Sequence, residues 1–216
     1  MNIQSFEGGY DKNLCYVISC PTTKIAAVID PSVSITPVTE YIEANDLILS
    51  KILISHTHHD HIFYLDNFLY LFPNIEVICH ENHIKKFEHH TVKVTDYEII
   101  TLGLEILISI HTPGHYADSI CYWNEKRDLL FTGDTIFVGR TGRVQSNNSN
   151  IHDLYNSVYN KIFKLSHDTV IYPGHNYGFS ESISIKDNIN FSKFFSCKSF
   201  EEFELVMKNF EKNYKP

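Results

Sequence analysis

The sequence predicts an α/β fold in which layers of β-sheet are covered by helices within one domain. Short apolar strand segments alternate with short amphipathic segments along the chain. Hydrophobic residues make up 43% and charged residues 20% of the 216 residues, as in soluble globular proteins. The apolar runs are far shorter than the ~20 residues that cross a bilayer, so no membrane span is expected.

Each element can be assigned in order from local patterns. Apolar and β-branched residues bounded by turn signals predict strands at 14–19, 25–29, 51–54, 76–79, 98–102, 104–110, 119–123, 128–131 and 169–172. Apolar residues at helical spacing predict helices at 36–45, 59–71, 150–165 and 199–210. Asn150 is expected to cap the third helix, and Ser199 and Glu202 form a capping box at the fourth. We divide the chain into a main domain, 1–180, and a short C-terminal helical extension, 181–216, that packs on it.

Charge and cysteine content exclude several functions. Eighteen Lys and Arg against 26 Asp and Glu give a net charge of −8 without a basic cluster, so nucleic acid is not an expected partner. The five cysteines include no CxxC pair, which is typical of reduced thiols in a cytoplasmic protein. The first ten residues lack the basic and apolar regions of a secretory signal, which also predicts a cytoplasmic location.

The 13 histidines include a dense motif, HTHHDH, at 56–61. It directly follows a buried strand, in the kind of turn where α/β sheets place their ligands. His56 and His58 point to the same side of an extended backbone, and Asp60 and His61 reach the same space as the chain turns into a helix. Imidazole and carboxylate suit zinc, iron or manganese. Chance produces this pattern in only roughly a few of a thousand such chains, so we interpret it as a metal site.

Three further ligand-type residues each follow a predicted strand and a glycine. They are His115 in TPGH, Asp134 in FTGD and His175 in PGH. Loops at the carboxyl ends of neighbouring strands converge on one edge of a sheet, so these side chains are expected to join the first motif. Among the other histidines, His59 is expected to point away from His58, and His80 is expected to be solvated.

The motifs HTHHDH, TPGH, FTGDT and PGH, in this order and spacing, resemble the metallo-β-lactamase superfamily. They look most like its glyoxalase II (hydroxyacylglutathione hydrolase) and persulfide dioxygenase branch, and the likeness extends over 13–177. The resemblance implies an αββα sandwich of two mixed β-sheets covered by helices, with metals at one edge between the sheets. The stretch 182–195 resembles the short tail of compact members of this branch.

The resemblance also implies a site for two divalent metal ions, with zinc expected and iron or manganese as alternatives. The first ion would be held by His56, His58 and His115, the second by Asp60, His61 and His175, and Asp134 would bridge them. Asp60 and Asp134 are also the expected catalytic carboxylates. Asp30, which ends an early strand, matches an acidic residue that supports the metal-binding loop in this family.

Such a site suits the hydrolysis of small thioesters, because a metal activates water and a thiol with a pKa of about 8.5 leaves readily. The expected enzyme is therefore a metallo-hydrolase of the glyoxalase II type. Arg143 matches the basic residue that holds a glutathione carboxylate, and Tyr177 matches an aromatic residue that contacts glutathione. The expected partner is a glutathione-derived thiol ester or persulfide; a homodimer stays open. Only 41 residues follow His175, where full-length glyoxalase II has a helical domain, so a different small thiol also stays open.

The alternative is a persulfide dioxygenase that acts on glutathione persulfide. In that case His56, His115 and Asp134 would hold a single Fe(II) as a two-histidine, one-carboxylate triad. The motifs do not separate the two reactions, because that branch keeps the other ligand-type residues. We prefer the hydrolase because hydrolysis is the commonest chemistry of the superfamily, which is an argument by analogy.

Overall fold

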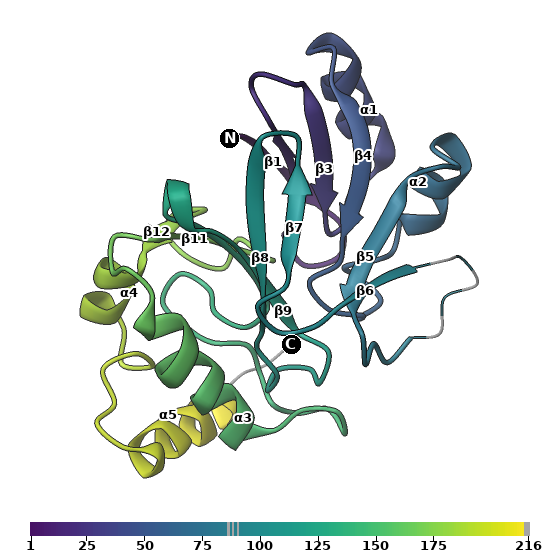
Figure 1. The fold of residues 1–216 in the computed structure, drawn as a ribbon. Coiled ribbons are helices and arrows are strands. Elements are labelled where there is room, and N and C mark those ends of the chain that lie inside the picture. Colours follow the sequence, from purple (N-terminus) through teal and green to yellow (C-terminus); the bar gives the residue numbers. More distant parts are fainter. Residues whose placement is uncertain (86, 88, 90, 214–216) are drawn as a thin grey trace.

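The computed structural model describes residues 1–85, 87, 89 and 91–213. Its strands form two six-stranded sheets with helices on both outer sides (Figure 1). Both sheets are mixed, because β3 to β6 run parallel in the first and β10 and β11 run parallel in the second, whereas the other neighbours are antiparallel. The predicted αββα sandwich is confirmed.

The strands of both sheets lie in chain order. The first sheet contains β1 (Asn2–Gly8), β2 (Asn13–Ser19), β3 (Ile25–Ile29), β4 (Ile48–Leu53), β5 (Glu76–His80) and β6 (Thr91–Val94). The second contains β7 (Ile99–Leu102), β8 (Glu105–His111), β9 (Ile120–Asn124), β10 (Leu129–Gly133), β11 (Val170–Pro173) and β12 (Ile183–Ser184).

The helices divide between the two outer faces (Figure 1). The first sheet is covered by α1 (Ile35–Ala44) and α2 (Leu65–Leu71). The second is covered by α3 (Ile151–Tyr155), α4 (Ile185–Phe191) and α5 (Phe200–Asn213). A π-turn, Asn156–Lys161, and a 3₁₀ turn, Ile162–Lys164, continue from α3, and a further 3₁₀ turn, Glu125–Arg127, joins β9 to β10.

Three apolar layers hold the sheets and helices together. Strand β2 is buried along its whole length, and its residues alternate between two of these layers. Tyr16 and Ile18 enter the layer between the sheets, while Cys15 and Val17 enter the layer beneath α1 and α2. This alternation is what a strand covered on both faces requires. The third layer joins the second sheet to α3, α4 and α5.

The strands β1, β6 and β12, the helix α4 and the true start of α2 were not predicted. β1 is a partly exposed edge strand with polar residues between its apolar ones, and β6 has only four residues, so both gave weak signals. The helix expected from His59 begins only at Leu65. The preceding segment forms turns, and its end is held by the backbone N–H of Tyr64, which donates to the carbonyl of Pro31 at 3.0 Å. The cap at Asn150 is confirmed, because its side chain accepts bonds from the next helical N–H groups.

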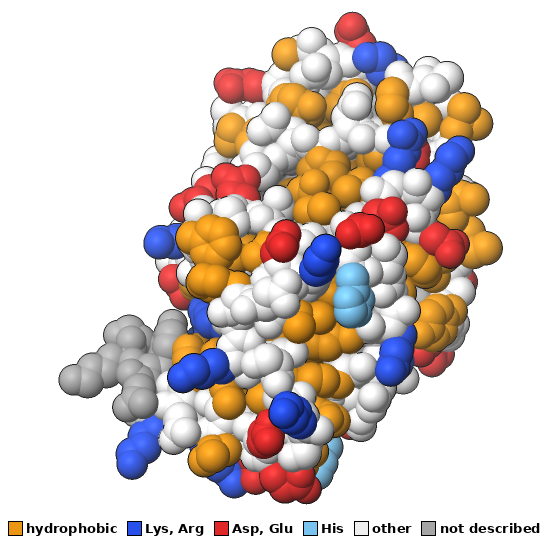
Figure 2. Space-filling model, turned by 90° about the vertical axis from the view of Figure 1, so that its left-hand side faces the viewer, with side chains coloured by type: hydrophobic (Ala, Val, Ile, Leu, Met, Phe, Trp, Pro, Cys, Tyr) orange, Lys and Arg blue, Asp and Glu red, His pale blue; other side chains and the backbone are white. Residues whose placement is uncertain are grey.

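The C-terminal helices pack on the second sheet through Ile185 of α4 and Phe203 and Met207 of α5. A domain division after residue 180 stays a prediction. On the face drawn in Figure 2, Lys and Arg side chains are scattered among acidic ones without a gathered basic patch. Within the described ranges, no helix is long and apolar enough to cross a membrane.

Candidate metal centre

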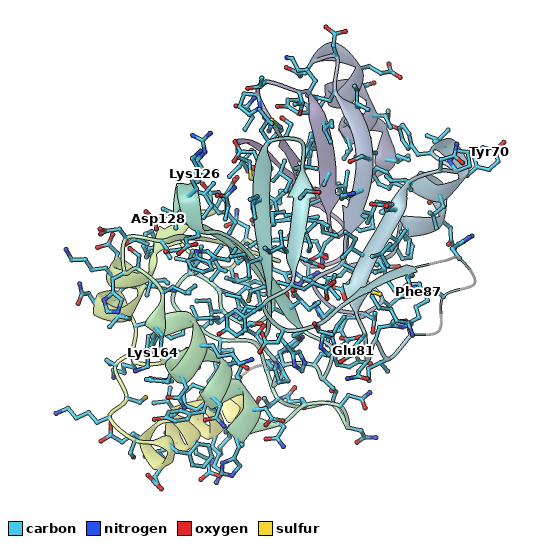
Figure 3. The ribbon with its side chains drawn as sticks, in the orientation of Figure 1. Tyr70, Glu81, Phe87, Lys126, Asp128 and Lys164 are labelled. Atoms are coloured by element: carbon cyan, nitrogen blue, oxygen red, sulfur yellow. The ribbon has the colours of Figure 1, made fainter. Side chains whose placement is uncertain are left out.

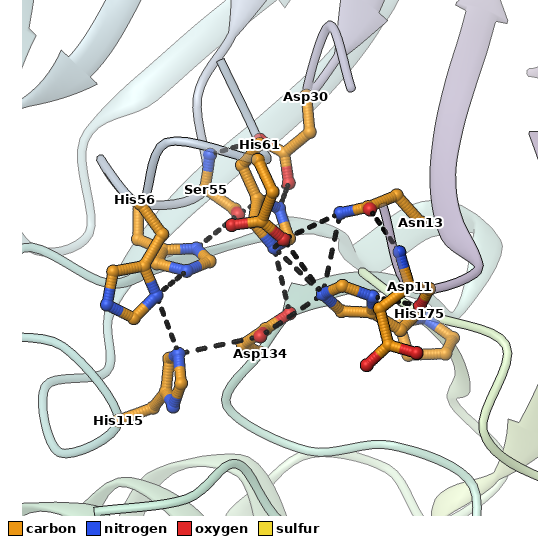
Figure 4. A network of polar contacts seen from close by, with 12 residues as sticks. Asp11, Asn13, Asp30, Ser55, His56, His61, His115, Asp134 and His175 are labelled. Carbon is orange, nitrogen blue, oxygen red and sulfur yellow. Dashed lines mark hydrogen bonds and ion pairs between the residues drawn. The ribbon is translucent and has the colours of Figure 1, made fainter. Parts of the chain in front are cut away.

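The HTHHDH loop leaves the end of β4 and is held in place by Asp30. The two Asp30 carboxylate oxygens accept bonds from the backbone N–H of Ser55 at 2.7 Å and its hydroxyl at 2.6 Å. One of them also accepts from Nδ1 of His61 at 2.9 Å. Asp30 adopts a left-handed φ of 50°, a conformation that Asp tolerates better than most residues. The expected supporting role of Asp30 therefore has a direct structural basis (Figure 4).

Three imidazoles form the first ligand cluster. His58 Nδ1 lies 2.9 Å from His56 Nε2 and 3.0 Å from His115 Nε2. Two nitrogens bound to one tetrahedral ion at ~2.0–2.1 Å would lie about 3.3 Å apart, so these atoms already have nearly the spacing of a ligand set. His56 and His115 are buried, and the ring of Tyr116 packs on His58 with centroids 4.1 Å apart.

A carboxylate and two imidazoles form the second cluster. His61 Nε2 lies 3.2 Å from His175 Nε2, and Asp60 Oδ2 lies 3.4 Å from His175 Nε2 and 3.6 Å from His61 Nε2. His61 and His175 are buried, whereas the Asp60 side chain is 29% exposed. Asp60 is therefore the member of this cluster that reaches solvent.

Asp134 lies between the two clusters (Figure 4). Its Oδ1 is 3.2 Å from His61 Nε2, and its Oδ2 is 3.4 Å from His115 Nε2 and 3.5 Å from His175 Nε2. Oδ1 is buried and has no hydrogen-bond partner among the described residues. A buried carboxylate oxygen without a donor is costly unless a cation satisfies it. The seven histidine and aspartate side chains therefore fit divalent metal ions. Their ligand atoms form three groups, and within each group the atoms lie within 4.8 Å of one another.

Two of the glycines in the sequence motifs allow this convergence. A Cβ at Gly133 would meet the Ser55 hydroxyl at 2.5 Å, and Gly133 also has a φ of 47°. A Cβ at Gly174 would meet Asp134 Oδ1 at 2.6 Å and the ring of His61 at 2.7 Å. A side chain at either position would push the ligand loops apart.

In four of the histidine rings, Nδ1 has an oxygen partner outside the clusters, so Nε2 points toward the other ligands. A ring whose Nδ1 donates outward keeps the lone pair of Nε2 free for a metal. The donor and acceptor pairs are His56 and the Ser55 hydroxyl at 3.1 Å, His61 and Asp30 at 2.9 Å, His115 and the Arg143 carbonyl at 2.8 Å, and His175 and the Asp11 carbonyl at 2.7 Å.

The two clusters differ in their electrostatics. Burial lowers the pKa of the first-cluster imidazoles, and burial together with neighbouring imidazoles lowers that of His58 to about 4. Burial also disfavours the charged forms of His61 and His175, but Asp134 outweighs it and raises their pKa values, that of His175 to about 9. The first cluster is thus neutral, whereas the second balances positive charge against Asp134.

The proposed substrate residues flank these clusters. The Tyr177 ring stacks on His175 with centroids 4.8 Å apart, and its hydroxyl donates to Asp11 Oδ2 at 2.7 Å. The Arg140 guanidinium lies 3.9 Å from the centroid of Tyr177. Arg143 is half-buried beside His115, and its backbone carbonyl accepts a hydrogen bond from His115 Nδ1.

Three residues close to the clusters were missed by sequence analysis. Asn13 donates to Asp60 Oδ2 at 2.9 Å, and the Asp11 carbonyl holds His175. Buried Asp118 accepts from the backbone N–H of Thr57 at 3.2 Å and from its hydroxyl, and also from the N–H of Ile84 at 2.9 Å. Only the position of Asp118, three residues after a predicted ligand, could have drawn attention to it.

The other histidines have mixed outcomes. His59 is exposed, as expected. The prediction that His80 is solvated is wrong, because it is only 4% exposed and stacks on His111 with centroids 3.8 Å apart. Its position at the end of β5, between the two sheets' loops, buries it despite its polar neighbours in sequence.

Comparison with known proteins shows the family. The model of the metallo-beta-lactamase superfamily matches residues 8–175, so the chain belongs to this superfamily. A hydroxyacylglutathione hydrolase from Francisella tularensis subsp. novicida is 39% identical over 70% of this chain, which spans 59% of that relative. PksB of Bacillus subtilis, a probable polyketide biosynthesis zinc-dependent hydrolase, is 27% identical over 88% of this chain and 85% of its own length.

Among solved structures, the crystal structure of ETHE1 from Myxococcus xanthus matches with a TM-score of 0.89 and 28% identity. The match covers 100% of this chain and 92% of that one. Together with the hydroxyacylglutathione hydrolases, it confirms the branch that the motifs predicted.

Proposed function

We propose that this chain is a metal-dependent hydrolase of small thioesters, of the hydroxyacylglutathione hydrolase type. The observation that supports this most is the pair of ligand clusters on one rim with Asp134 between them. In this proposal the ligands are those predicted from the motifs: His56, His58 and His115 for one ion, Asp60, His61 and His175 for the other, and Asp134 for both. Zinc is the proposed metal.

Bound divalent ions would lower the pKa of water to about 7 and polarise an acyl carbonyl. Asp60 would orient the attacking water by accepting its hydrogen bond. Burial opposes ionisation of this carboxyl, but His175, His61 and Asn13 outweigh it and hold its pKa well below the usual range. Asp60 therefore stays ionised and acts as an acceptor rather than as a strong base. A thiolate leaves without a dedicated acid, because ordinary thiols have a pKa of about 8.5.

Arg143 and Tyr177 are proposed to hold the thiol carrier. A guanidinium can bind a carboxylate through two parallel hydrogen bonds, which suits a carrier with a terminal carboxylate such as glutathione. Tyr177 has its ring fixed by His175 and its hydroxyl by Asp11, so it would offer a rigid surface to the carrier. A glutathione thioester would place the reaction in the cytoplasm.

A persulfide dioxygenase is the second candidate. The likeness to ETHE1 over the full chain favours it, whereas the chain spans only 59% of the hydroxyacylglutathione hydrolase. In this reading His56, His115 and Asp134 would hold a single Fe(II).

Elemental analysis of the purified protein, combined with two assays, tests the proposal. One assay follows hydrolysis of S-lactoylglutathione, and the other follows oxygen uptake with glutathione persulfide. Two zinc ions per chain with the first activity would support the hydrolase. One iron per chain with oxygen uptake and no hydrolysis would overturn it in favour of the dioxygenase.

A further inference from the structure

An exposed aromatic cluster borders the metal centre. Tyr10, in the turn between β1 and β2, is 65% exposed, and Phe63, just after the HTHHDH loop, is 39% exposed. Their rings meet edge to face with centroids 5.0 Å apart. The ring of His59 lies 5.1 Å from Phe63 and 6.2 Å from Tyr10. We call these three residues the aromatic shelf.

The aromatic shelf is fastened to the second ligand cluster. The backbone N–H of Tyr10 donates to the side-chain oxygen of Asn13 at 3.1 Å, and the Asn13 amide donates to Asp60 Oδ2 at 2.9 Å. His59 lies between His58 and Asp60 in the chain, so its backbone is part of the ligand loop. The shelf is therefore continuous with the part of the site where Asp60 reaches solvent.

The chemistry of the shelf differs from that of the clusters beside it. The clusters are built from imidazole and carboxylate groups that meet one another, whereas Tyr10 and Phe63 of the shelf present large apolar rings to solvent. Exposed apolar patches next to polar groups are typical of ligand-binding surfaces. Because the shelf adjoins the proposed reaction centre, it suits a part of the substrate that is apolar and close to the reacting carbon.

We propose that the aromatic shelf binds the acyl group of the thioester, so that this chain prefers apolar acyl groups such as butyryl and hexanoyl to acetyl. The proposal rests on the thioester hydrolase function proposed above. Arg143 and Tyr177, the proposed carrier contacts, belong to the loops after β10 and β11, whereas the shelf belongs to the β1–β2 turn and the segment before α2. The Tyr177 hydroxyl donates to Asp11 Oδ2 at 2.7 Å, and Asp11 adjoins Tyr10 in the β1–β2 turn, so the carrier contacts and the shelf lie next to each other.

The size of the expected preference for longer acyl chains follows from how much of each methylene the shelf can bury. Each methylene that is fully buried changes binding by about fourfold. An open shelf covers one side of the chain, so about twofold per methylene is expected. Hexanoyl has four methylenes more than acetyl, which gives a preference in kcat/KM of roughly tenfold to twentyfold.

The test measures kcat/KM for acetyl-, butyryl- and hexanoyl-glutathione with the full chain and its variants. Tyr10→Ala and Phe63→Ala should each reduce the hexanoyl-to-acetyl ratio to below about threefold. Tyr10→Phe should keep the ratio, because the ring and not the hydroxyl makes the contact. Tyr70→Ala is the matched control: Tyr70 is 86% exposed on α2 (Figure 3) and belongs to neither the ligand clusters nor the shelf, so its loss should leave the ratio unchanged.

A binding measurement separates this proposal from the proposed function. S-hexylglutathione and S-methylglutathione place an alkyl group where the acyl group lies and contain no hydrolysable bond. Calorimetry should show tighter binding of the hexyl compound, with the difference lost in Tyr10→Ala. If no thioester is hydrolysed but this difference is present, the hydrolase proposal fails and the shelf stands as a binding surface.

Two results would overturn the proposal. One is a wild-type ratio near one in both experiments. The other is an unchanged hexanoyl-to-acetyl ratio in Tyr10→Ala and Phe63→Ala. A change of oligomeric state in the same variants, measured by light scattering, would then identify the shelf as a contact between copies of the chain.

Discussion

Two buried carboxylates at opposite ends of the second sheet have contrasting surroundings. Glu105 begins β8 and is 6% exposed, and Asp134 follows β10 and is 8% exposed. Glu105 accepts hydrogen bonds from Arg127 at 2.9 Å, Asn124 at 3.2 Å and the amino group of Met1 at 2.9 Å. Asp134 instead faces imidazoles, and one of its oxygens has no hydrogen-bond partner among the described residues.

The difference separates a structural carboxylate from a functional one. Burial disfavours ionisation of both, but Arg127 and the amino group of Met1 bring the pKa of Glu105 to about 2, and His175 and His61 hold that of Asp134 well below its usual range. Both are therefore ionised. Glu105 is neutralised by fixed donors, whereas Asp134 is neutralised by residues that can also bind metal. Buried charges without dedicated partners are where ligands are expected.

The largest expected effect follows from Asp134→Ala. The substitution removes the group between the two clusters, so activity should fall by at least about a thousandfold and metal content should drop. Activity assays and elemental analysis on the same samples measure both. Full activity in this variant would contradict the ligand assignment and remove the contrast with Glu105.

Asp118→Asn should have the next largest effect. In either orientation the amide places an NH2 donor opposite a backbone N–H, that of Thr57 or that of Ile84, and so loosens the segment that carries His56 and His58. Residues that orient ligands in this way typically contribute about tenfold to a hundredfold in metal affinity. Titration with Co²⁺, followed by its visible spectrum, measures this, and an unchanged affinity would limit Asp118 to a role in folding.

Arg143→Ala tests substrate recognition apart from the metals. Loss of a carboxylate contact made equally in the ground and transition states should raise KM for a glutathione thioester by about tenfold and leave kcat within about twofold. Metal content should stay at the wild-type level. An unchanged KM would show that the carrier is held elsewhere.

Glu105→Gln should affect stability and not chemistry. Leaving Arg127 with a weaker partner should cost about 1–3 kcal/mol in the free energy of unfolding. The folded pKa of Glu105 is about 2, below an unfolded value of about 4.3, so its contribution is complete above pH 4.3 and is lost as the pH falls toward 2.

Urea unfolding at several pH values measures this, and the variant should lose less stability than the wild type on acidification. A change in kcat or metal content in Glu105→Gln would break the distinction between the two carboxylates.

Much of the fold was accessible from sequence because its strands are strongly patterned. β2 and β3 are apolar and almost wholly buried, β8 carries apolar residues from Ile106 to Ile110, and each was predicted within a residue or two. β1 lies at a sheet edge and is only partly buried, so its composition carries little information. The segment before α2 has helical spacing but is held in turns by the bond from Tyr64 to Pro31, which no local pattern reveals.

The residues of the site likewise fall into those that local motifs predicted and those that they did not. The seven predicted ligands were visible because each stands in a compact motif beside a strand end, and the structure brings all of them to one rim. Asn13, Asp11 and Asp118 contact this rim across 47 to 164 positions of sequence. Such contacts depend on how the two sheets are stacked, so they could not be predicted from local spacing.

The central claim is that one rim of the sandwich binds two metal ions. A crystal structure of the purified protein, with anomalous data collected at the zinc edge, tests it most directly. We predict two peaks about 3.5–4 Å apart, one beside His58 and one beside His175, with Asp134 contacting both. A single peak held by His56, His115 and Asp134, or no peak at this rim, would contradict the account.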